Sequence, residues 1–227
     1  MEKMKTTNIK LILLTFIASI AFSCEDEVTD FGFNGTISGT VNDNDGTALF
    51  GDLNSNNLVV YLLGEGDEQP TQIRVDGEGS YQNLKMYPKA HKVWLEGPIV
   101  ASDTVSVDFS TQETFEKSFA VIPLISPKIS SATAQGQTIS VDYAILPNQG
   151  NTVSKMEVYC STVKYPTAGT GSRTNIYFTK TVELSELSGS VIIDGLESGI
   201  EYNIRIGAQA QTASVMNYSN QVTAVTN

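Results

Sequence analysis

The sequence is poor in the residue types on which most metal sites and many enzymes depend. Its 227 residues include one histidine, two cysteines and one tryptophan, and only 17% are charged, against about 25% in an average globular chain. One imidazole and two thiols supply little for a transition-metal site or for imidazole catalysis. Lys and Arg number 14 against 25 Asp and Glu, a net charge of −11. Because so acidic a chain repels phosphate backbones, nucleic acid is not expected as a partner.

Long apolar runs are also missing beyond the first two dozen residues. There, three lysines precede a largely apolar run over residues 11–22, which is followed by Ser23 and Cys24. This order of positive charge, apolar run and small residue is that of a secretory signal peptide. The run is shorter than the roughly 20 residues of a membrane-spanning helix, so we expect residues 1–23 to be cleaved.

Residues 21–24 resemble a relaxed lipobox, in which the cysteine sulfur is acylated and the chain is cut just before it. Two acyl chains are enough for stable membrane anchoring. The acidic residues 25–27 resemble the surface-export signal of Bacteroidetes lipoproteins. We therefore expect a lipidated Cys24, a tether over residues 24–32, and a place in the outer membrane facing the cell surface. An ordinary signal peptide with an accidental cysteine, or a tether on the periplasmic side, are the alternatives.

Lipidation of Cys24 would leave Cys160 as the only thiol, so no intrachain disulfide could form. Around it, residues 156–161 interleave apolar and polar side chains as a strand does. We expect Cys160 to be a small buried hydrophobe rather than a nucleophile.

The rest of the chain has the pattern of a β-protein. Beyond about residue 30 no apolar period of 3.6 residues extends over ten positions, and short runs of Val, Ile, Thr and aromatics alternate with Gly, Asn, Asp and Pro. Strands are predicted over 33–41, 58–63, 72–75, 80–84, 92–96, 104–109 and 115–122, and then over 128–134, 138–145, 155–161, 175–182, 190–193, 202–211 and 220–226.

This spacing predicts an all-β fold of two tandem β-sandwiches, over residues 33–123 and 127–227. Pro123 and Pro127 bracket residues 124–126, which we expect to be a short junction because proline cannot donate to a central ladder.

The second half carries a family resemblance. Residues 191–208 resemble the E strand, turn and F strand of a fibronectin type III domain. The resemblance implies a tyrosine corner, in which the Tyr202 hydroxyl bonds the nearby backbone. Asn203, Arg205 and Gly207 alternate with apolar neighbours, which predicts one buried face for this strand.

The first half resembles a carboxypeptidase-regulatory-like, transthyretin-type sandwich through residues 36–46 and 75–84, two strand–turn–strand segments with Gly and Asp at the turns. In its relatives this module is a non-catalytic addition. A lipidated cysteine, this module and a fibronectin-like module together resemble a Bacteroidetes outer-membrane lipoprotein family of unknown function, the DUF3823 type. Members are found beside outer-membrane glycan-import systems, so the resemblance implies an outer-membrane transporter complex as a partner.

No residue set indicates catalysis, a metal ion or a cofactor. Residues 41–46 are spaced like the start of an EF-hand loop, but Val41 stands where the first carboxylate is required, so an Asx-rich hairpin turn is expected. The single histidine, His91, follows no nucleophile elbow and is expected at the surface, in a loop or at a strand edge. A hidden carboxylate pair for glycoside hydrolysis stays the open alternative to a non-enzymatic chain.

The aromatic residues are the candidates for ligand binding, because sugars pack their C–H faces on aromatic rings. Strict alternation over residues 92–96 places Trp94 opposite the face of Val93 and Leu95, where it binds a ligand or covers the junction or the tether, unless a bulge returns it to the core. The long loop 164–173 offers Tyr165 for stacking and Arg173 for paired hydrogen bonds, unless this loop has no specific role.

The function expected from these features is that of a non-catalytic surface lipoprotein that binds or presents glycan beside an outer-membrane polysaccharide-import system. The alternative is an adhesin or structural assembly subunit that binds another protein.

Asp103-Thr104-Val105 is similar to the O-glycosylation motif of Bacteroidetes secreted proteins, with a plain strand start as the alternative.

Overall fold

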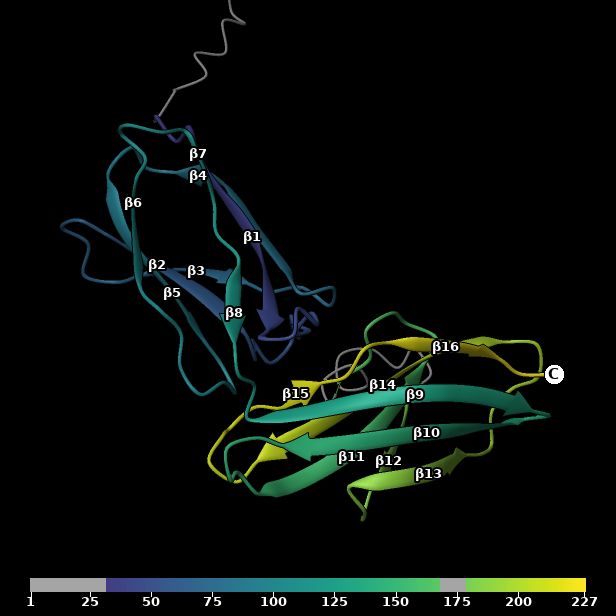
Figure 1. Ribbon diagram of the computed structural model, residues 1–227. Helices are drawn as coiled ribbons and strands as arrows, with labels where there is room; N and C mark the ends of the chain where they lie inside the picture. The colour runs from purple at the N-terminus through teal and green to yellow at the C-terminus, as the bar shows by residue number, and fades with distance from the viewer. Residues whose placement is uncertain (1–31, 168–178) are drawn as a thin grey trace, which may run out of the picture. The chain divides into compact units, whose positions relative to one another are not determined.

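The computed structural model describes residues 32–167 and 179–227, which consist of β-strands and their connections (Figure 1). No helix in these two stretches is long and apolar enough to cross a membrane. Residues Phe33–Asn227 form one compact unit with two main hydrophobic cores, one built within residues 37–121 and the other within residues 125–210. The predicted all-β fold with β-sandwiches is confirmed. The expected signal peptide, Cys24 and nearly all of the expected tether lie outside the described residues.

The first sandwich consists of two four-stranded sheets. One sheet contains β1 (Gly35–Asp43), β4 (Ser80–Met86), β7 (Thr114–Glu116) and β8 (Phe119–Val121). The other has the order β3-β2-β5-β6, with β2 at Val59–Gly64, β3 at Thr71–Arg74, β5 at Ala90–Glu96 and β6 at Val105–Asp108. Alternate apolar residues of both sheets point inward and form the first core.

Two turns of this sandwich are built in the same way. The Asp43 carboxylate accepts hydrogen bonds from the backbone N–H groups of residues 45 and 47, and Asp76 does the same for residues 78 and 80. Gly46 and Gly79 each adopt a φ of 84°, which favours glycine. The expected Asx-rich hairpin turn after Val41 is therefore confirmed.

The single strand predicted over residues 115–122 is wrong, because it is two short strands, β7 and β8, with a break at Lys117. The Lys117 carbonyl accepts a hydrogen bond from the Tyr81 hydroxyl, and its N–H donates to the carbonyl of Ser38 at 2.9 Å. These bonds hold the chain beside β1, while β7 and β8 pair in parallel with different parts of that strand.

His91 is buried, with 4% of its surface exposed, so the expectation of a surface histidine is wrong. Its Nδ1 lies 2.8 Å from the carbonyl oxygen of Lys89, and its ring meets the Phe109 ring edge-on at 5.4 Å. The alternation of β5 places His91 on the same inward face as Val93, which accounts for its burial.

The second sandwich pairs a three-stranded sheet with a five-stranded one. The smaller sheet has the order β13-β10-β9, with β9 at Ile125–Gln135, β10 at Thr138–Pro147 and β13 at Ser188–Ile193. The larger sheet contains β11 (Val153–Ser161), β12 (Thr179–Glu183), β14 (Glu201–Ala210), β15 (Asn217–Tyr218) and β16 (Val222–Val225).

Strand β9 begins at Ile125, inside the segment predicted as the junction, and it continues through Pro127. A proline fits there because β9 is an edge strand of its sheet, and an N–H that points away from the sheet has no neighbouring strand to bond. The N–H groups of Ile125 and Ile129 each donate at 3.1 Å to a side-chain carbonyl, from Asn217 and Asn220 respectively. The outer edge of β9 is thus closed by two amides and a proline.

The predicted tyrosine corner is confirmed. Tyr202 is 1% exposed, and its hydroxyl accepts a hydrogen bond of 3.0 Å from the N–H of Glu197. The prediction of one buried face for β14 is incomplete, because Asn203 and Arg205 are buried as well. Strand β14 lies in the middle of its sheet, and its second face is covered by side chains from distant parts of the sequence, including Phe50.

Candidate functional site

The outer face of the sheet β3-β2-β5-β6 presents an aromatic pair. Along β5, Val93 and Leu95 are buried, Lys92 and Glu96 are exposed and Trp94 is partly exposed, as the sequence alternation predicts. Tyr61 on β2 lies directly opposite Trp94. Their rings are nearly parallel, with an interplanar angle of 12° and centroids 5.4 Å apart. The register of two neighbouring strands therefore creates an aromatic surface that is partly open to solvent.

The indole of Trp94 is held in place by Glu96. Its Nε1–H donates a hydrogen bond of 2.7 Å to Oε1 of this carboxylate, which stands two residues further along the same face. Polar side chains continue this face on β3, where Gln72 lies opposite Tyr61 and Arg74 lies opposite Val59. The aromatic pair is thus fixed in orientation and bordered by groups that can donate and accept hydrogen bonds.

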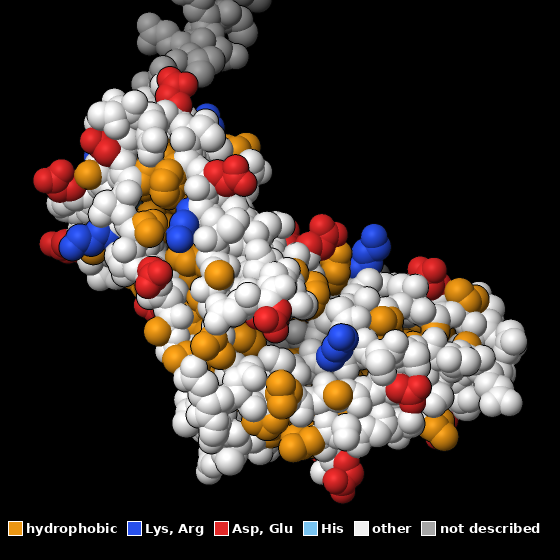
Figure 2. All heavy atoms as spheres, viewed as in Figure 1, with side chains coloured by type: hydrophobic (Ala, Val, Ile, Leu, Met, Phe, Trp, Pro, Cys, Tyr) orange, Lys and Arg blue, Asp and Glu red, His pale blue; other side chains and the backbone are white. Residues whose placement is uncertain are grey.

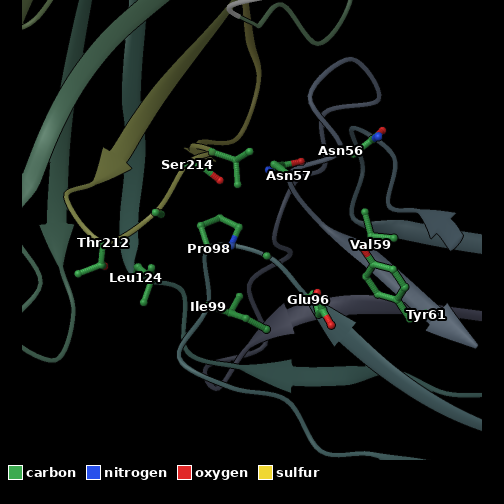
Figure 3. A pocket seen from close by; sticks show the side chains of 13 residues that line it. Asn56, Asn57, Val59, Tyr61, Glu96, Pro98, Ile99, Leu124, Thr212 and Ser214 are labelled. Carbon is green, nitrogen blue, oxygen red and sulfur yellow. The ribbon is translucent and has the colours of Figure 1, made fainter. Parts of the chain in front are cut away.

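A groove of about 530 Å³ begins where the aromatic pair ends (Figure 3). Tyr61 belongs to both, and Glu96, which accepts the Trp94 hydrogen bond, also lines the groove, so the aromatic pair and the groove form one continuous surface. The groove is lined by residues 56, 57, 59 and 61, by 96–99 and 124, and by 212–215. In the close-up, Tyr61, Val59 and Glu96 lie on one side, and Thr212, Ser214 and Leu124 on the other. We call this combined surface the Trp94 groove.

Hydrogen bonds tie the two walls of the Trp94 groove together. Asn57 donates from Nδ2 to the carbonyl oxygen of Met216 at 3.0 Å, and its Oδ1 accepts from the N–H of Asp52. From the opposite direction, the Asn217 amide donates to the carbonyl oxygen of Pro98 at 3.1 Å. The hydroxyl-bearing turn 212–215 is therefore held beside the first sandwich, while Asn56, Thr212 and Ser214 remain exposed to a ligand.

A second cavity, of about 700 Å³, is a weaker candidate. It is lined largely by apolar side chains, and three of the four asparagines along it, Asn148, Asn217 and Asn220, already bond backbone groups. Because these amides are engaged, they offer less to a polar ligand than the exposed groups of the Trp94 groove.

Tyr165 does not lie at the Trp94 groove. Its hydroxyl donates to Oε1 of Glu78 at 2.5 Å, its N–H donates to the side chain of Gln221, and its ring packs so closely on Gly77 that a side chain there would collide with it. The structure thus places Tyr165 between a turn of the first sandwich and the second sandwich. Arg173, the other residue proposed from the same loop, lies outside the described residues.

Sequence reasoning missed the buried Arg205. Its guanidinium is completely buried, donating to the carbonyl oxygens of Ser219 at 3.2 Å and Gly51 at 3.4 Å, and it lies 4.7 Å from the ring centre of Tyr218. Phe50 and Tyr165 are also close, at 5.8 and 5.9 Å. Burial lowers the pKa of Arg205 to about 10, so the group stays charged at neutral pH. Since its partners come from three separate segments, no local pattern could reveal this cluster.

Cys160 and the segment 103–105, which the sequence analysis also considered, lie away from the Trp94 groove. Cys160 is fully buried, and burial raises the pKa of its thiol to about 12, which confirms the expected buried hydrophobe. Asp103 and Thr104 are exposed just before β6, so the motif there is open to solvent. Within residues 32–167 and 179–227, no group of three or more His, Cys, Asp or Glu side chains is placed to hold a metal ion.

The charge on the surface is dispersed. Figure 2 shows Lys and Arg side chains standing singly among acidic ones on the face in view. Only three ion pairs occur within the described part of the chain, between Lys89 and Asp67, Lys155 and Glu157, and Lys180 and Asp194. None of them involves the Trp94 groove.

No model of a known sequence family matches the chain, and no curated protein matches it in sequence. Its structure is similar to two DUF3823 family proteins. The one from Bacteroides ovatus has a TM-score of 0.65 at 16% identity over 85% of this chain and 99% of that one. The one from Parabacteroides merdae has a TM-score of 0.67 at 17% identity over 83% and 97%.

A third similar structure is that of a Bacteroides uniformis protein described as a "putative carbohydrate binding protein". It has a TM-score of 0.64 at 18% identity over 86% of this chain and 100% of that chain. The chain thus has the two-sandwich architecture found in DUF3823 family proteins, in agreement with the family resemblance seen in its sequence.

Proposed function

We propose that the protein binds glycan in the Trp94 groove and carries out no chemistry on it. The observation that supports this most directly is the parallel pair of Tyr61 and Trp94, oriented by Glu96 and continuous with a groove that both sandwiches line. A pyranose ring packs its C–H face on such rings, and its hydroxyl groups bond the surrounding amide, hydroxyl and carboxylate groups. The groove volume lies within the roughly 300–1,000 Å³ of small-molecule sites.

The similar Bacteroides uniformis structure, described as a "putative carbohydrate binding protein", supports the same proposal. We extend the proposal to the cell: Cys24 is lipidated and anchors the chain in the outer membrane, facing the cell surface, where glycan is delivered to a polysaccharide-import complex. The sequence supports this part through its signal peptide pattern and the acidic residues after Cys24. Mass spectrometry of the mature N-terminus should find an acylated Cys24, and an unmodified protein in the medium would refute the anchor.

The glycan proposal is tested with a panel of soluble polysaccharides in affinity electrophoresis, followed by calorimetry for each polymer that retards the protein. Trp94→Ala and Tyr61→Ala should each weaken binding by about ten-fold or more, because removal of a central aromatic contact typically costs over 1 kcal/mol. Tyr87→Ala is the matched control, since Tyr87 is an exposed aromatic of the same sandwich that does not line the groove.

Three outcomes separate the competing functions. Retardation that disappears with Trp94→Ala supports glycan binding in the groove. Retardation that persists in Trp94→Ala and Tyr61→Ala but falls in Tyr165→Ala would move the site to the loop around Tyr165. Failure of every polymer to bind, together with co-purification of a membrane protein, would replace the proposal with an adhesin or assembly subunit.

A further inference from the structure

The Trp94 groove contains one charged side chain among its described lining residues. Glu96 is that residue, and the polar lining otherwise consists of uncharged amide and hydroxyl groups from Asn56, Asn57, Tyr61, Thr212 and Ser214. A site that binds a carboxylated or sulfated sugar normally contains Arg or Lys, because a guanidinium or an ammonium group forms charge-assisted hydrogen bonds to these anions. Neither residue type occurs among the described residues that line the groove.

Glu96 keeps an unneutralised negative charge at the point where the aromatic pair meets the groove. Its side chain is exposed, and Oε1 accepts the Trp94 Nε1–H, a neutral donor. In the described part of the chain, no Lys or Arg nitrogen lies within 4.0 Å of this carboxylate.

Two cations stand on the same sheet face, but outside the groove lining. Arg74 is separated from Glu96 by Val59, which pairs with both, and it donates from Nη1 to the carbonyl oxygen of Leu53 at 3.2 Å. Lys92 lies beyond Trp94, four residues before Glu96 on β5. Among the described residues that line the groove, the carboxylate of Glu96 is therefore the one charged group, while Lys92 stands as near to Trp94 along β5 as Glu96 does.

Resting on the proposed function, we propose that the Trp94 groove selects uncharged glycans and that Glu96 is the residue that excludes anionic ones. A sugar hydroxyl can donate a hydrogen bond to Oε2 of Glu96, which has no partner among the described residues, whereas a carboxylate or sulfate placed there is repelled. Repulsion between two unit charges about 4 Å apart in water costs about 1 kcal/mol, roughly five-fold in affinity, and more where water is displaced. Recognition and exclusion thus come from the same side chain.

The experiment compares polymers that share a backbone and differ in charge. Suitable pairs are methyl-esterified and de-esterified homogalacturonan, hydroxyethylcellulose and carboxymethylcellulose, and dextran and dextran sulfate. For every pair of which one member binds, the neutral polymer should bind about five-fold or more tightly than the charged one. Glu96→Gln should reduce this ratio about five-fold, because the amide keeps an oxygen for the Trp94 N–H and removes the negative charge.

The matched control is Glu68→Gln, which removes the same charge from an exposed turn of the first sandwich and should leave the ratio unchanged. A charged polymer that binds as well as its neutral partner, or a ratio that Glu96→Gln does not alter, overturns the exclusion while glycan binding stands. If Glu96→Gln and Glu68→Gln reduce the ratio of affinities equally, the discrimination comes from the net charge of the protein, and the role of Glu96 is overturned. Absence of binding to every polymer defeats the proposed function itself and the exclusion with it.

Discussion

Replacement of Arg205 measures what a buried charge contributes where the two sandwiches meet. Arg205→Met keeps much of the side-chain volume but leaves the carbonyl oxygens of Ser219 and Gly51 without their donor. Each buried carbonyl left unsatisfied costs about 1–3 kcal/mol, and the lost contact with the Tyr218 ring about 2 kcal/mol. Burial of a guanidinium has an unfavourable desolvation energy of several kcal/mol, and the methionine removes it, which stabilises the variant.

This desolvation is not fully offset in the native protein, because Nη2 of Arg205 is buried and has no hydrogen-bond partner in the described part of the chain. The opposing contributions therefore leave a net destabilisation of about 1–2 kcal/mol for Arg205→Met. Arg205→Ala loses the same contacts and also leaves a cavity, so we expect a loss of about 4 kcal/mol.

Urea unfolding followed by intrinsic fluorescence measures both changes, provided that the m-value stays constant. Arg74→Met is the control, because this exposed arginine should change the free energy of unfolding by no more than about 0.5 kcal/mol. A loss below about 1 kcal/mol in Arg205→Ala, or a gain in stability in Arg205→Met, would refute the reasoning, since the contacts would then not outweigh the desolvation of the guanidinium.

Three further predictions follow from individual side chains. Because burial raises the pKa of Cys160 to about 12, a Cys24→Ser chain should show no reactive thiol toward Ellman's reagent at pH 8 until urea is added, and rapid native labelling would contradict this. Tyr202→Phe removes the acceptor of the Glu197 N–H and should lower the free energy of unfolding by about 1 kcal/mol, so an unchanged urea midpoint would count against the tyrosine corner. Hydrogen bonds from two serines lower the pKa of Asp142, so its stabilising effect is present above an unfolded pKa of about 3.9 and is lost as the pH falls through the folded pKa. Asp142→Asn should therefore destabilise the protein more at pH 7 than at pH 2, and an equal effect at both pH values would refute this assignment.

Local patterns predict most of the strands, because the signals involved act over a few residues. Alternation along β5 places Trp94 outside and Val93 inside, and the Gly and Asp residues at the turns are found where their backbone geometry requires them. Where prediction failed, long-range contacts decide. The chain breaks at Lys117 because of a bond from Tyr81, 36 residues earlier in the sequence.

The candidate site shows the same division. Trp94 could be chosen from its own neighbours, but Tyr61 becomes its partner only through the register of β2 and β5, and the turn 212–215 enters the groove from the other end of the chain. Arg205 alternates with apolar residues like an exposed strand residue, yet aromatic rings from three segments cover it. Sequence periodicity shows which side chains share a face, whereas the surroundings of that face depend on the assembled fold.

The closed edge of β9 determines where the smaller sheet of the second sandwich could recruit another chain. With Pro127 and the amides of Asn217 and Asn220 occupying its outward positions, β9 offers an incoming strand little to pair with. Strand β13, at the opposite border, has no proline, and its Ile192 is 66% exposed. Any growth of this sheet by addition of a foreign strand, whether in a specific complex or in aggregation, should therefore start at β13 and proceed in one direction only.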